Sequence, residues 1–162
     1  MEVFKAELKK THATEIEQLK SDLKSTAFER QTRFAKLHET RAEVVAELYK
    51  LLVVADSAVR KLLDVEPSEN EEYKRMFVET GKKTTEFSNF FEERRIYFDE
   101  ELCKLIDTHT SNFSQAWLYG SPFAERIFGD REVIKKQLTE LIEAIPAVRH
   151  AIEKRMREML GV

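Results

Sequence analysis

The stretch RFAKLHETRAEVVAELYKLL, residues 33–52, decides the fold class, because its apolar side chains recur every three or four residues. This spacing continues to Leu62 and gives nine positions on one face of a helix: Phe34, Leu37, Arg41, Val44, Leu48, Leu51, Ala55, Ala58 and Leu62. Eight of the nine are apolar, which predicts a coiled-coil-like seam rather than a strand. Arg41 is the polar member, and we expect it to set the register by pairing with a glutamate of a facing helix.

The composition agrees with a chain of long helices. The 162 residues include only 4 Gly and 3 Pro, while charged residues make up 35% and hydrophobic residues 42%. Few helix breakers among many charged and aliphatic residues are typical of all-α proteins. The length is sufficient for one domain with a real core. The formal net charge of −3 gives no general attraction to nucleic acid or to an anionic membrane.

The first helix is expected to be unusually long, because residues 1–66 contain neither proline nor glycine. A thinner apolar stripe precedes the seam and consists of Phe4, Leu8, Ile16, Leu19 and Leu23. Two readings stay open: a continuous helix over residues 2–63, about 90 Å long, or a new helix that starts at a capping box of Thr26 and Glu29. We predict an N-terminal helical extension over 1–25 and a bundle domain over 26–162.

Three shorter helices are expected after the turn at Pro67. They are predicted over residues 68–93, over 99–118 with Asp99 as N-cap, and from Asp130 to the C-terminus, with a kink before Pro146. The segment 119–129 between the last two is predicted to be a loop in which AERIF forms one turn. The fold prediction is an antiparallel helical bundle with a long N-terminal helix.

The extension is the predicted partner-binding element. The three shorter helices can cover the seam from Phe34 to Leu62, but little sequence is left to cover Phe4 to Leu23. A lone helix with an apolar stripe is marginally stable in water. We therefore expect this stripe to bind a second copy of the chain or another helical protein, or to fold back at Thr26.

Aromatic residues in the loop are a second candidate for partner binding. They are Trp117, Tyr119, Phe123 and Phe128. Aromatic side chains on irregular backbone are good anchors at protein interfaces. They are equally suited to closing the end of a bundle, and both readings stay open.

No motif predicts catalysis, a cofactor or a metal. Glu39, Glu43 and Glu47 share one helix face, but no Glu-x-x-His pair occurs anywhere, as a di-iron bundle would require. These glutamates are expected to form a charged flank facing lysines and arginines of other helices. Cys103 lies one turn into a predicted helix between Leu102 and Ile106, which favours a buried structural thiol over a nucleophile. Phosphate-binding glycine loops and nucleophile elbows are absent, so we expect a non-enzymatic protein.

Nucleic-acid binding is the alternative function. The basic pairs Lys82-Lys83, Arg94-Arg95 and Lys135-Lys136 could contact phosphates. Glutamates alternate with them, so solvated helix faces are the favoured interpretation. No apolar run is long enough for a membrane span, residues 1–10 show no apolar core of signal-peptide length, and the single cysteine suits a reducing compartment. We expect a soluble cytoplasmic protein.

Three segments carry a resemblance: LHETRAEVVAELY (37–49), RRIYFDEELCKLID (94–107) and EKRMREMLGV (153–162). They resemble segments of a set of uncharacterised prokaryotic all-helical proteins, in the forms LHxxRAExxAxLY and RIYF-x-EELC. The resemblance covers about a third of the chain. It implies a bacterial helical protein and carries no implication for an activity.

Overall fold

The chain is all-α in the computed structural model, which describes the backbone of residues 2–162 and the side chains from Thr11 onward. The elements are α1 (Glu2–Leu63), α2 (Glu71–Arg94), the 3₁₀ turn η1 (Arg95–Tyr97), α3 (Glu100–Tyr119), α4 (Ala124–Phe128) and α5 (Arg131–Leu160). No strand occurs among the residues described. The predicted fold class is confirmed. The side chains of Phe4 and Leu8 lie outside the described residues.

Helix α1 passes through Thr26 without a break, so the capping-box reading is wrong. The Thr26 hydroxyl donates a hydrogen bond of 2.9 Å to the carbonyl oxygen of Asp22, one turn earlier. A threonine that bonds back to residue i−4 is compatible with a helix interior. The Thr-x-x-Glu spacing therefore does not start a helix here.

The chain divides into two compact units, residues 1–41 and 42–162. The division comes later than the predicted boundary at residues 25 and 26. Burial explains its position: every side chain from Thr11 to Glu39 is exposed, and Val45 is the first buried residue among the described side chains of α1. The prediction that the shorter helices cover the seam from Phe34 onward is wrong at its start, since Phe34 and Leu37 are exposed.

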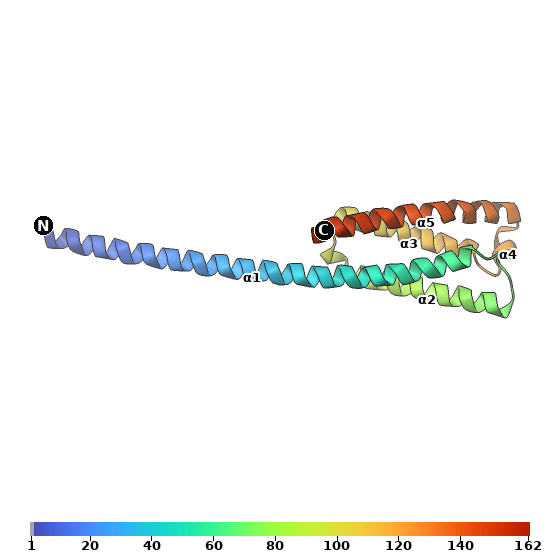
Figure 1. The fold of residues 1–162 in the computed structure, drawn as a ribbon, viewed down its shortest axis with the longest axis horizontal. Helices are drawn as coiled ribbons and strands as arrows, with labels where there is room; N and C mark the ends of the chain where they lie inside the picture. Colours follow the sequence, from blue (N-terminus) through green and yellow to red (C-terminus); the bar gives the residue numbers. More distant parts are fainter. Residues whose placement is uncertain (1) are drawn as a thin grey trace. The chain divides into compact units, whose positions relative to one another are not determined.

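The second unit is an antiparallel bundle formed by the last part of α1 with α2, α3 and α5, which run side by side with alternating direction (Figure 1). The short helix α4 lies in the connection from α3 to α5. Its five residues are the predicted turn AERIF. Bundles with short connections between neighbours favour this up-and-down arrangement.

Side-chain caps fix where the shorter helices begin. Asp99 accepts a hydrogen bond of 2.9 Å from the backbone N–H of Leu102, and Asp130 accepts one of 2.9 Å from that of Glu132. Both predicted caps are confirmed. Helix α2 begins three residues later than predicted, because Asn70 caps it through the N–H of Tyr73 at 2.7 Å.

The core of the bundle is wider than a two-helix seam. The buried side chains of α1 include Val45, Leu48, Leu52, Ala55, Val59 and Leu62, whereas the predicted Val44 and Leu51 are half-buried. A helix that contacts two neighbours needs a broader apolar face than one that contacts a single partner. The other helices contribute Phe87, Phe91, Leu102, Ile106, Phe113, Ile145 and Ile152 to this core.

Two residues that disfavour helices lie inside continuous ones. Helix α5 runs through Pro146, and α2 runs through Gly81. A Cβ atom at position 81 would lie 2.8 Å from Nε1 of Trp117. Gly81 therefore gives the indole room to pack against α2, where Trp117 stacks on Phe77 with ring centroids 4.5 Å apart.

Candidate functional site

The first candidate site is an exposed apolar face on the N-terminal part of α1. Five large side chains spaced to share one face are each exposed by half or more: Ile16 (53%), Leu19 (62%), Leu23 (64%), Phe34 (69%) and Leu37 (51%). We call these five residues the open stripe. Water-exposed apolar faces of this length mark binding surfaces for other helices.

Not every exposed apolar residue of this segment belongs to the open stripe. Phe28 is 71% exposed, but it precedes Phe34 by six residues. At 100° per residue this places it about 120° around the helix from Phe34. Phe28 therefore offers a matched reference for any experiment on the stripe.

The structure places Trp117 and Tyr119 in α3 and Phe128 in α4, so of the four predicted loop aromatics only Phe123 lies outside a helix. Tyr119 and Phe128 pack on each other with ring centroids 4.8 Å apart, and both are half-buried. Trp117 and Phe123 keep more of their surface in solvent, although Trp117 stacks on Phe77 and the guanidinium of Arg126 lies over the Phe123 ring. Each of the four therefore packs against another side chain of the bundle unit.

A second candidate site is a buried charge cluster inside the bundle, composed of Asp56, Arg60, His109, Arg149 and Glu153. Asp56 and His109 are fully buried. One oxygen of Asp56 accepts hydrogen bonds from Nη1 of Arg149 at 2.6 Å, and Nε of Arg60 lies 3.0 Å from the same oxygen. Nε of Arg149 donates to Glu153 at 3.0 Å. The cluster thus joins α1 and α5 through charged groups, and the His109 ring of α3 lies beside it.

The protonation of His109 follows from its surroundings. Nε2 of His109 lies 3.8 Å from the second oxygen of Asp56, and neither ring nitrogen makes a hydrogen bond. Burial lowers the pKa of His109 to about 4; the Asp56 carboxylate opposes this shift, while Arg149 and Arg60 add to it. His109 is therefore neutral at pH 7.

The buried imidazole predicts an acid-sensitive fold. Unfolded His109 takes up a proton near pH 6.5, but folded His109 does so only near pH 4, so the unfolded state binds more protons between these values. Stability must then fall as pH falls through this window. We expect His109 to account for about 2 kcal/mol of lost unfolding free energy between pH 7 and pH 5. Urea denaturation at both pH values measures it.

The control for this pH effect is His150, which is exposed. A His109→Gln variant should lose most of the slope, whereas His150→Gln should keep it. An unchanged slope in His109→Gln would show that other groups govern the acid sensitivity.

The sequence analysis missed the cluster as a unit. His109 was predicted on the core edge of its helix, but Asp56 lies beside Ala55 on a seam predicted to be narrower, and Arg149 follows the apolar Val148. The available signal was Asp56, one residue from a seam position, together with Arg149, which lies between Ile145 and Ile152. It becomes meaningful only when the distance between helices is known.

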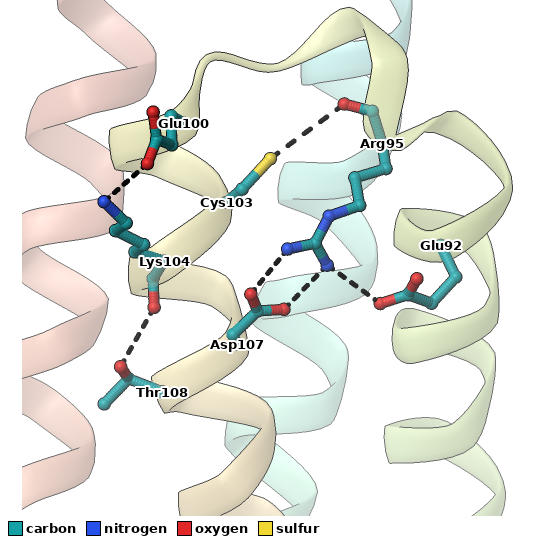
Figure 2. Close-up of polar contacts among 7 residues, drawn as sticks. All are labelled: Glu92, Arg95, Glu100, Cys103, Lys104, Asp107 and Thr108. Carbon is teal, nitrogen blue, oxygen red and sulfur yellow. Dashed lines mark hydrogen bonds and ion pairs between the residues drawn. The ribbon is translucent and has the colours of Figure 1, made fainter.

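A group of partly exposed ion pairs lies next to Cys103, near the N-terminal end of α3 (Figure 2). The Arg95 guanidinium donates to both oxygens of Asp107, at 2.8 and 2.6 Å, and to Glu92 at 3.2 Å. The hydrogen bond from Arg95 lowers the pKa of Asp107. Arg95 therefore ties η1 to α3.

Cys103 is the buried thiol that the sequence predicted. Its Sγ atom lies 3.9 Å from the backbone oxygen of Arg95. Burial raises the pKa of Cys103, although Arg95 opposes the shift. We expect iodoacetamide to alkylate Cys103 far more slowly in the native protein than in 6 M guanidinium, by at least about tenfold. Equal rates would contradict a protected thiol.

Of the predicted charged flank, only Glu47 forms an ion pair in the described part of the chain, and its partner lies on the same helix rather than on another one. Glu47 pairs with Lys50 on the same helix at 2.9 Å, and no ion pair of Arg41 occurs in the described part of the chain. The predicted pairing of Arg41 with a glutamate is therefore not observed, and its Nε is buried without a hydrogen bond. Among side chains from Thr11 onward, no group of three or more His, Cys, Asp or Glu residues is placed to hold a metal ion.

The basic pairs of the alternative function are largely engaged by carboxylates. Arg94 pairs with Glu93 at 2.8 Å, Arg95 with Asp107, and Lys83 with Glu79 at 3.4 Å. A guanidinium already bonded to a carboxylate contributes less to phosphate binding. No described helix combines the length and apolarity that crossing a membrane requires.

An open groove of about 960 Å³ lies between α2 and α3. Small and hydroxyl side chains line much of it, including Gly81, Thr84, Ser88 and Ser114. The Thr84 and Ser88 hydroxyls donate to backbone carbonyls one turn earlier, at 3.1 and 2.9 Å. These two hydroxyls are therefore bonded within their own helix.

Comparison of the chain with protein-family models, with curated proteins and with solved structures finds no match. The resemblance of the three segments stays a prediction.

Proposed function

We propose that the protein is a non-enzymatic helical interaction module that self-associates through its N-terminal helix. In this role it acts as a scaffold or regulatory subunit of a larger bacterial assembly. The single observation that carries the proposal is the open stripe, whose five apolar side chains are each exposed by half or more.

The energy available from the open stripe supports a specific interface. Fully burying one leucine or phenylalanine side chain contributes about 1.5–3 kcal/mol. Five such residues on each copy exceed what two helices need to offset the loss of translational and rotational freedom. A helix that carries such a surface stays unpaired in water only at low protein concentration.

The interior of the bundle supports a structural rather than a catalytic role. Arg149 of α5 bonds one oxygen of Asp56 on α1, and His109 is neutral and fully buried beside them. A fixed buried ion cluster is well suited to specifying one helix arrangement. The bundle is then a folded domain that self-association of α1 brings together with the bundle of a second copy.

The test compares the full chain with a Leu19→Gln/Leu23→Gln double variant by light scattering. Glutamine keeps the helix propensity of leucine within a few tenths of a kcal/mol but removes the apolar surface. We expect the full chain to be dimeric or larger and the double variant to dissociate at the same concentration. Equal monomeric masses for both proteins would refute self-association.

A further inference from the structure

We propose that the open stripe binds a second copy of the chain in antiparallel orientation, so that Ile16 of one copy lies near Leu37 of the other. This inference rests on the proposed self-association and adds its direction. The occupant is a second copy, because the same surface supplies both the apolar face and the complementary charges.

Charge is distributed unequally along the helix that carries the stripe. Residues 11–25 carry three acidic side chains (Glu15, Glu17, Asp22) and two lysines (Lys20, Lys24), a net charge of −1. Residues 26–37 carry three basic side chains (Arg30, Arg33, Lys36) and one acidic side chain (Glu29), a net charge of +2. Every one of these residues is exposed.

A parallel pair would place each half against its own copy, so that both halves repel. An antiparallel pair places the +2 half against the −1 half of the second copy, and both contacts become attractive. Charges that flank an apolar seam set orientation and partner choice in this way.

Arg30 strengthens the preference because it lies on the stripe itself, four residues before Phe34 and seven after Leu23. In a parallel pair in register, the two Arg30 guanidinium groups would face each other across an apolar seam. Like charges in that position destabilise the pairing. In the antiparallel pair, Arg30 instead faces Leu23 of the second copy, next to the acidic Asp22.

Spin-label distances between the two copies test the direction. Thr14→Cys and Ser25→Cys, each in the full chain with Cys103→Ala, place one label per copy on exposed positions of the face opposite the stripe. In the antiparallel pair, the two labels at 25 are offset along the helix by only about 5 Å, whereas those at 14 are offset by about 38 Å. We therefore expect a short distance for Ser25→Cys and a much longer one for Thr14→Cys.

The outcomes separate the inference from the function on which it rests. Equal label distances at both positions in a protein of dimeric mass would overturn the antiparallel direction and leave self-association standing. Absence of any dipolar signal, with monomeric mass for both variants and for the parent chain, would overturn both.

Discussion

Replacing Arg149 by methionine is expected to lower the free energy of unfolding by about 3 kcal/mol or more. Arg149 donates a 2.6 Å hydrogen bond to Asp56, whose carboxylate is fully buried. Methionine keeps much of the packing of the arginine stem. It leaves the Asp56 carboxylate with only one nearby cation, Arg60, whose side chain is half exposed to solvent. Urea denaturation at pH 7 and fixed protein concentration measures the loss.

Two controls make this prediction specific. Arg126→Met removes an exposed ion pair with Glu69 and should cost less than about 1 kcal/mol. The double variant Asp56→Leu/Arg149→Met removes both buried charges and should recover most of the loss. A loss for Arg149→Met no greater than that for Arg126→Met would show that the cluster is not the buried, coupled unit described.

Replacing Phe34 by glutamine is expected to weaken self-association on the order of 100-fold in Kd. Phe34 lies in the open stripe, and a symmetric pair contains two copies of it, so the substitution removes its buried surface from both sides of the interface. Removing about 1.4 kcal/mol of burial from each copy corresponds to that factor. A dilution series by sedimentation equilibrium gives the constant.

The matched control is Phe28→Gln. Phe28 and Phe34 are the same residue type in the same helix with nearly equal exposure, 71% and 69%, but Phe28 lies off the stripe. Its substitution should leave the dissociation constant within about threefold of the parent. Equal weakening by both substitutions would mean that association depends on the total exposed apolar surface of the helix and not on the open stripe.

Local signals predicted the helices well. The caps Asp99 and Asp130 each act on a backbone N–H within three residues, so the information lies in the adjacent sequence. The apolar faces of α3 and α5 also followed from spacing alone, since Leu102, Ile106, Phe113, Ile145 and Ile152 are all buried.

Other features depended on partners that sequence spacing does not specify. The Thr26 box was wrong because a Thr-x-x-Glu spacing also fits a helix interior, where the hydroxyl bonds back to Asp22. Burial in α1 begins at Val45 because helices of 24, 20 and 30 residues can cover only part of one with 62. Asp56 and Arg149 are 93 residues apart, so their contact needed the fold itself.

The most direct test of the central claim, that the open stripe pairs with a second copy, is the mass of the full chain in solution. The chain has a mass of 19.0 kDa. The mass measured by light scattering should therefore rise with protein concentration to about 38 kDa or more. A mass of 19.0 kDa at every concentration up to the millimolar range would contradict the account.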